Sequence, residues 1–246
     1  MDAVHEAVGD DLIIQITTEA VGRYTPDQQI ALVRDVHPEA ASVALKELTA
    51  DGENKAAAFY RWAYDEGIAL QHILYSPVEV AQLADLVRRN VVPGEDLSVL
   101  YVLGRYGDGQ SQPRDLLPFL AAAEEHELPA ASWSVCAFGA GEGAVALTAM
   151  SLGGHVRVGF ENNLYLNTGT LAPNNAALVK QVADGAKLIA RPLCRAAQAR
   201  ALMSPGREGE RKRRDEAVQK DGSRHHQFTQ VREGITENKI ENNIGR

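Results

Sequence analysis

Apolar and β-branched residues form short runs along the chain, and longer stretches between them repeat apolar residues every three or four positions. The short runs predict strands, and the longer stretches predict amphipathic helices. We expect strands at 12–17, 40–45, 68–75, 97–103, 132–138 and 155–160, and helices near 27–36, 55–66, 77–90, 113–126, 142–152 and 174–187. This alternation predicts an α/β fold made of six βα units around a parallel sheet.

Several helix starts are marked by capping residues. Thr25-Pro26 and Ser76-Pro77 each place a side-chain oxygen before a proline. Proline suits the first helical position because its missing N–H would have no partner there. Asn174 is a similar cap for the last of the six helices.

The composition changes sharply after residue 203, so we expect one folded domain over 1–203 and a disordered, charged tail over 204–246. The whole chain has 246 residues and a formal net charge of −8, but residues 1–203 hold 15 Lys/Arg against 25 Asp/Glu. Such an acidic body argues against nucleic-acid binding.

The chain contains no apolar run of the roughly 20 residues that a membrane span needs, and its first residues do not read as a signal peptide. We therefore expect a cytoplasmic protein that does not bind membranes. Cys136 and Cys194 lie in apolar settings without a metal-binding spacing, so we expect both to be buried, reduced thiols.

The segment 153–165 reads GGHVRVGFENNLY, and its alternation turns Arg157 to one face of a strand. Glu161, Asn162 and Asn163 follow where this strand meets a polar loop. Polar groups at the carboxyl ends of strands form the active sites of α/β barrels. The segment therefore predicts one edge of an active site.

This segment resembles the closing strand and loop of the β-keto acid cleavage enzymes, the family of 3-keto-5-aminohexanoate cleavage proteins. The similarity continues through 171–176 and back through 133–135 and 22–39, so that it covers roughly 11–203. It implies a (β/α)8 TIM barrel. The chain begins where the third strand of the family begins, so we expect an N-terminally incomplete barrel without the His-x-His pair that follows the family's second strand.

The resemblance implies roles for three residues of this segment. Glu161 matches a glutamate that, with the two histidines, binds a divalent metal, usually zinc, which polarises a ketone. Arg157 matches an arginine on the substrate side, where its guanidinium suits a carboxylate. Asn162 stands where the family has an aspartate that acts as a base, and an amide cannot accept a proton at neutral pH. Without the resemblance, Glu161 could be a simple loop cap and Arg157 part of an internal salt bridge.

A second departure is at the end of the strand 68–75, where three acids of the family pattern are replaced. Ile73 takes the place of a glutamate considered catalytic or substrate-orienting, and the adjacent His72 should point to the opposite face.

Weaker candidates follow other strands. Thr17 and Thr18 match family hydroxyls near the coenzyme A thioester, although Glu19 replaces part of a glycine-rich turn. Lys46 and Glu47 are either site residues or a salt-bridged rim. Gly139 and Gly141 could present N–H groups to a coenzyme A phosphate, or could simply form a tight turn.

The resemblance implies a retro-Claisen exchange, in which a β-keto acid and acetyl-CoA become acetoacetate and a new acyl-CoA. It also implies a homo-oligomer, since family members generally form tetramers. The alternative is a non-catalytic barrel remnant that serves as a binding or oligomerisation scaffold, which the absent metal histidines support. A phosphate-binding barrel of another activity would need a basic cluster near 139–143, and the sequence has none there.

Overall fold

The computed structural model describes residues 2–94, 96–105 and 110–203, which belong to one compact unit, Met1–Pro205. The predicted tail at 204–246 lies outside the described residues. No helix among the described residues is long and apolar enough to cross a membrane.

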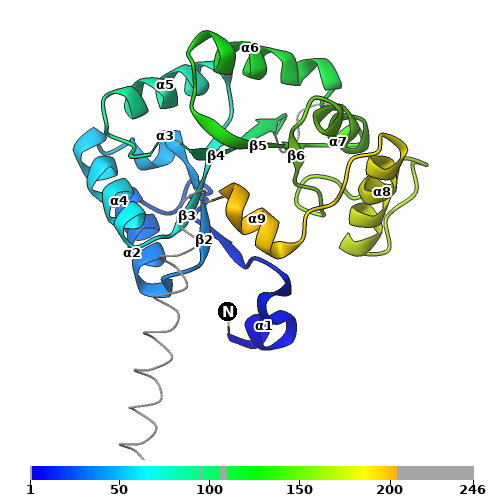
Figure 1. The fold of residues 1–246 in the computed structure, drawn as a ribbon, viewed down its shortest axis with the longest axis horizontal. Helices are drawn as coiled ribbons and strands as arrows, with labels where there is room; N and C mark the ends of the chain where they lie inside the picture. Colours follow the sequence, from blue (N-terminus) through cyan, green and yellow to red (C-terminus); the bar gives the residue numbers. More distant parts are fainter. Residues whose placement is uncertain (1, 95, 106–109, 204–246) are drawn as a thin grey trace, which may run out of the picture. The chain divides into compact units, whose positions relative to one another are not determined.

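Six parallel strands form one sheet in the order β1-β2-β3-β4-β5-β6. The strands are β1 Gln15–Thr17, β2 Ala40–Ala44, β3 Ala69–Leu74, β4 Leu97–Leu103, β5 Ala130–Ala137 and β6 His155–Val156. The sheet curls into a half-barrel, which confirms the predicted α/β fold with six βα units and an incomplete TIM barrel (Figure 1).

The helices are α1 Asp2–Val8, α2 Pro26–Val36, α3 Leu45–Leu48, α4 Glu53–Asp65, α5 Pro77–Arg88, α6 Leu117–Glu125, α7 Glu142–Ser151, α8 Asn175–Leu188 and α9 Ala196–Met203, with 3₁₀ turns η1 Gly9–Asp11 and η2 Pro113–Leu116. Helices α2 to α8 follow the outside of the curve, and α9 lies inside it (Figure 1). The predicted caps are confirmed, because Thr25, Ser76 and Asn174 each accept a backbone hydrogen bond at the start of their helix.

Two predictions need correction. The last strand ends at Val156 rather than at residue 160, because only the Arg157 N–H still donates to the neighbouring strand, at Val135 O, and the N–H groups of Gly159 and Phe160 find side-chain partners. Gly159 N–H donates to Glu142 Oε1 (3.1 Å) and Phe160 N–H donates to Asn175 Oδ1 (2.8 Å), so neither can extend the ladder. Cys136 is buried as expected, but Cys194 is exposed because it lies in the irregular segment between α8 and α9.

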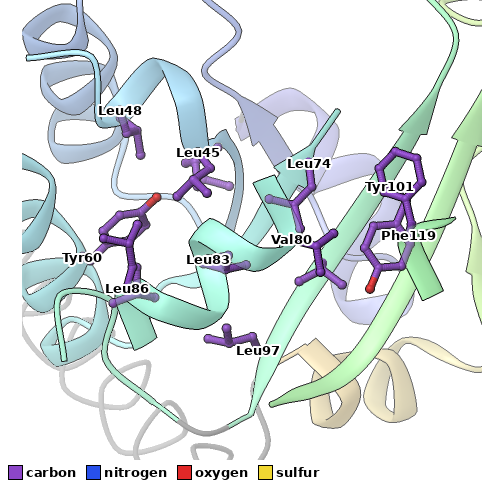
Figure 2. Packing of buried hydrophobic residues seen from close by; sticks show 14 of the residues in the cluster. Leu45, Leu48, Tyr60, Leu74, Val80, Leu83, Leu86, Leu97, Tyr101 and Phe119 are labelled. Atoms are coloured by element: carbon purple, nitrogen blue, oxygen red, sulfur yellow. The ribbon is translucent and has the colours of Figure 1, made fainter. Parts of the chain in front are cut away.

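The main hydrophobic core lies between the sheet and the outer helices. Figure 2 shows its central side chains, among which Tyr60, Leu83 and Tyr101 are almost fully buried. A second, smaller cluster occupies the concave face: Ala44, Ile73, Leu100, Val102 and Cys136. Because alternate residues of each strand face opposite sides, the concave face carries the side chains that point away from the outer helices.

A polar row crosses the concave face one layer toward the amino ends of the strands. The strand register aligns Thr17, Ser42, Gln71, Ser98 and Ser132 across five neighbouring strands. The apolar cluster follows this row, and the carboxyl ends of the strands come after it. Chemistry is therefore expected at the carboxyl-end rim, where the chain leaves the sheet in loops.

Candidate active site at the carboxyl ends of the strands

Arg157 directly follows β6, and its guanidinium is held on two sides. One nitrogen, Nη2, lies 3.3 Å from Cys136 Sγ and 3.3 Å from Glu161 Oε1. The backbone is fixed as well, because Arg157 N–H donates to Val135 O at 2.9 Å. The side chain remains 34% exposed. A half-exposed guanidinium with a fixed direction can bind an anionic group of a ligand.

The loop that carries Arg157 and Glu161 is anchored by a buried carboxylate. Glu142, at the start of α7, is 1% exposed. Its Oε1 accepts the Gly159 N–H, and its Oε2 accepts Asn163 Nδ2, both at 3.1 Å. Burial raises the pKa of the Glu142 carboxyl, and the two hydrogen bonds oppose that rise. The loop conformation therefore depends on a carboxylate outside it.

Two further carboxylates stand on the opposite side of the rim, after β1 and β2. Glu47 Oε2 accepts the Ala20 N–H at 3.0 Å and Gln29 Nε2 at 2.7 Å. Glu47 thus fixes the turn that follows β1. Glu19 lies in this turn and is partly buried.

Charged groups from several parts of the rim act on the carboxyl group of Glu19. Burial raises the pKa of the Glu19 carboxyl, and the nearby carboxylates of Glu161 and Glu47 raise it further. The positive charges of Arg157 and Lys46 act in the opposite direction. These charged groups belong to the segments that follow β1, β2 and β6, so the curl of the sheet brings the ends of its first and last strands to one site.

The Tyr75 hydroxyl and the Cys136 thiol, in the middle of the rim, are poor proton acceptors at neutral pH. Lys46 Nζ stands 3.7 Å above the centre of the Tyr75 ring. Burial and the neighbouring carboxylates raise the pKa of the Tyr75 hydroxyl above its usual value. Burial likewise raises the pKa of the Cys136 thiol to about 11, so that Cys136 is neutral at pH 7 and is not an activated nucleophile.

The two predicted threonines differ in their surroundings. Thr17 is exposed at the end of β1, and its Oγ1 accepts the Glu19 N–H at 3.4 Å. Thr18 is buried, and its Oγ1 donates to Ser42 O at 3.2 Å. Thr17 therefore remains accessible at the rim, whereas Thr18 is tied to the neighbouring strand.

The predicted glycines lie between β5 and α7. Gly139 N–H donates to the carbonyl of Asn162 at 3.0 Å, which links this turn to the loop after β6. Gly141 has no room for a side chain, because a Cβ there would lie 1.9 Å from Ser111 O. Both observations suit a tightly packed turn.

Asn162 is 6% exposed, and its Nδ2 has no hydrogen-bond partner among the described residues. Ile73 lies in the concave apolar cluster, so its side chain provides no acid or base. His72 faces the other side of β3, as predicted, and packs against the Tyr60 ring at 5.4 Å between ring centres. It cannot replace a lost acid of the rim.

The described residues do not supply a complete metal site. Among residues 2–94, 96–105 and 110–203, no group of three or more His, Cys, Asp and Glu side chains is placed to hold a metal ion. Glu161 is a single carboxylate, and it pairs with Arg157. Zinc sites in proteins usually need at least three protein ligands.

Sequence reasoning singled out Arg157 and Glu161 but did not identify the parts played by Glu142, Glu47 and Glu19. A signal for Glu142 was available, because a glutamate opens an otherwise apolar helix next to the predicted loop. Glu19 and Glu47 had only their positions after strands as a signal. The proximity of Glu19 to Arg157 depends on the curl of the sheet.

Comparison with known proteins identifies the family of this chain. The profile of the β-keto acid cleavage enzymes matches residues 1–204. A 3-keto-5-aminohexanoate cleavage enzyme of Acetoanaerobium sticklandii is 29% identical over 210 residues, which are 82% of this chain and 74% of that protein. The corresponding enzyme of Fusobacterium nucleatum is 26% identical over 83% of this chain and 74% of its own length.

A more local match is the 3-oxoadipate:acetyl-CoA acetyltransferase of Cupriavidus necator, which is 37% identical over 107 residues, or 44% of this chain and 37% of that protein. The family profile spans nearly all of the described residues, including every element of the rim. The chain belongs to the β-keto acid cleavage enzyme family.

Proposed function

We propose that this chain exchanges acyl groups between a β-keto acid and acetyl-CoA, giving acetoacetate and a new acyl-CoA. Membership of the family supports cleavage of a β-keto acid. The name of the Cupriavidus necator relative supports acetyl-CoA as the second substrate. The observation that carries the proposal is Arg157, a fixed and half-exposed guanidinium at the carboxyl ends of the strands.

In this proposal, Arg157 binds the carboxylate of the β-keto acid. Its Nη2 is already directed by Cys136 and Glu161, so little side-chain freedom is lost when a ligand binds. The exposed hydroxyl of Thr17 lies near the thioester, and Thr18 supports the end of β1. Gly139 and Gly141 lie near the coenzyme A phosphates in this proposal, in a turn that the Gly139 N–H links to the Asn162 carbonyl.

Asn162 has an orienting role in this proposal and not that of a base. Its amide nitrogen is buried without a partner among the described residues, so a ligand oxygen could satisfy it. An amide cannot take up a proton at neutral pH. The reaction therefore needs a base elsewhere.

We also propose that Glu161 is one carboxylate ligand of a zinc ion. The described residues offer no complete donor set, so no catalytic step is assigned to the metal. Elemental analysis of the purified chain and of Glu161→Gln tests this assignment. Bound zinc that is lost in the variant supports it, and equal zinc in both forms contradicts it.

The substrate assignment is tested by incubating the chain with acetyl-CoA and each of a series of β-keto acids, including 3-oxoadipate and 3-keto-5-aminohexanoate. Acetoacetate and the new acyl-CoA are measured by mass spectrometry. We expect Arg157→Lys to lower kcat/KM roughly 10- to 100-fold, since a lysine cannot make the two-point contact of a guanidinium. Arg88→Lys, on the exposed face of α5, is the matched control.

Absence of products with every β-keto acid would contradict the proposal and leave the scaffold alternative. Retention of full activity by Arg157→Lys would contradict the role of Arg157 alone. We further propose that the chain associates with its own copies, as the family resemblance implies. Light scattering of the purified chain tests this, and a monomer at micromolar concentration would contradict it.

A further inference from the structure

Acyl exchange at a β-keto acid requires a carbon nucleophile. The carbon between the ketone and the carboxylate must lose a proton before it can attack a thioester, so a proton acceptor must stand at the site. Asn162 and Ile73 cannot accept that proton. The acceptor must therefore be another group of the rim.

Most acidic groups of the rim are already engaged. Glu161 pairs with the guanidinium of Arg157 at 3.3 Å. Glu47 accepts hydrogen bonds from Ala20 N–H and from Gln29 Nε2. A carboxylate that holds a turn or a guanidinium in place cannot leave that partner for a substrate without disturbing the site.

Glu19 differs from both. Its carboxylate makes no hydrogen bond or ion pair with any residue that the structure describes, although its backbone N–H is bound to Thr17. It is partly buried in the turn that Glu47 fixes. Its electrostatic neighbours come from three segments of the chain: Lys46 and Glu47 in α3 after β2, Tyr75 after β3, and Arg157 and Glu161 after β6.

We propose that Glu19 is the general base of this site, a role that rests on the acyl-exchange function proposed above. Glu19 is the carboxylate of the rim that has no partner among the described residues, and it shares that rim with Arg157, which binds the substrate carboxylate. The raised pKa of Glu19 makes its carboxylate a stronger proton acceptor than a solvent-exposed glutamate.

The step balances as a proton transfer followed by acyl transfer. Glu19 accepts the proton from the central carbon, and the C–H electron pair becomes the enolate pair. That carbon bonds to the carbonyl carbon of acetyl-CoA, and the thiolate of coenzyme A leaves. The thiolate then attacks the original ketone, whose bond to the central carbon breaks. The central carbon takes the proton back from Glu19, which releases acetoacetate, and nothing is oxidised or reduced.

The test compares wild type, Glu19→Gln, Glu19→Asp and the control Glu124→Gln, which removes an exposed carboxylate from α6. Two quantities are measured. The first is kcat and KM for acyl exchange with the best β-keto acid of the series. The second is the rate at which the central carbon of that acid exchanges hydrogen for deuterium without acetyl-CoA, followed by NMR against the uncatalysed rate.

We expect Glu19→Gln to lower kcat by about 10²- to 10⁴-fold, with KM little changed, and to reduce hydrogen exchange to the uncatalysed rate. Glu19→Asp should keep part of both activities, and Glu124→Gln should match wild type. Wild-type exchange in Glu19→Gln, or an effect on KM alone, would overturn the proposal while the acyl-exchange function stands. A wild-type chain that is inactive with every β-keto acid would overturn both.

Discussion

Replacing Glu142 by glutamine tests whether a buried carboxylate positions the loop that carries Arg157 and Glu161. Both oxygens of Glu142 accept hydrogen bonds, from Gly159 N–H and from Asn163 Nδ2. Glutamine has almost the same shape but keeps one acceptor and gains an NH₂ group. In Glu142→Gln, the new NH₂ group would therefore face either the Gly159 N–H or the Asn163 NH₂, and two donors cannot form a hydrogen bond.

The surroundings cannot relieve this conflict by turning an amide. Asn163 Oδ1 already accepts the Tyr165 N–H at 3.0 Å, and its Nδ2 donates to Tyr165 O at 2.6 Å. Rotating the Asn163 amide would break both bonds, and the Gly159 N–H cannot reverse at all. One buried donor thus loses its partner.

Leaving a buried donor unsatisfied costs roughly 1–3 kcal/mol. The neutral amide avoids the burial cost that raises the pKa of the Glu142 carboxyl, so we expect the lower part of this range, about 1–2 kcal/mol. For a chain of this size, that corresponds to a decrease in Tm of roughly 2–8 °C. A displaced loop should also lower kcat/KM by about 10- to 100-fold, since small shifts of catalytic groups are costly.

Thermal unfolding followed by circular dichroism, together with the acyl-exchange assay, measures both effects. Glu124→Gln is the control for loss of one carboxylate, because it lies exposed on α6. If Glu142→Gln has the Tm and the kcat/KM of wild type, Glu142 does not position the loop. If Tm falls and kcat/KM is unchanged, Glu142 stabilises the fold without controlling the site.

Two further predictions concern the core. Burial lowers the pKa of His72 to about 4 in the folded chain, whereas the ordinary value near 6.5 applies to the unfolded chain. Between pH 6.5 and pH 4 only the unfolded chain binds a proton at this histidine, so the free energy of unfolding decreases as the pH falls. The free energy of unfolding from urea titrations should therefore drop by about 2 kcal/mol more for wild type than for His72→Leu between pH 7 and pH 5; equal drops would contradict a buried, neutral His72. A Cβ at Gly154 would lie 2.2 Å from the Trp133 ring, so Gly154→Ala should cost about 1–3 kcal/mol by overpacking. An unchanged Tm would show that the ring can move aside.

The alternation of apolar residues was enough to predict the elements of the sheet. The strand predicted over 97–103 agrees with β4, Leu97–Leu103, because all its side chains are buried and local hydrophobicity decides it. The strand predicted to reach residue 160 was wrong beyond Val156. The N–H groups of Gly159 and Phe160 bind Glu142 and Asn175, which lie 17 and 15 positions away in the sequence.

Part of the candidate site could likewise be predicted from the sequence, and the rest depended on the tertiary structure. Motif and strand alternation placed Arg157 and Glu161 at the end of a strand, because both lie in one short segment whose local geometry the sequence determines. Only the tertiary structure showed that Glu19 meets them across the rim and that Glu47 is already engaged. The pKa and the free lone pairs of a carboxylate depend on which charges and donors surround it. The neighbours of Glu19 lie far apart in the sequence, and the curl of the six-stranded sheet brings them close to its carboxylate.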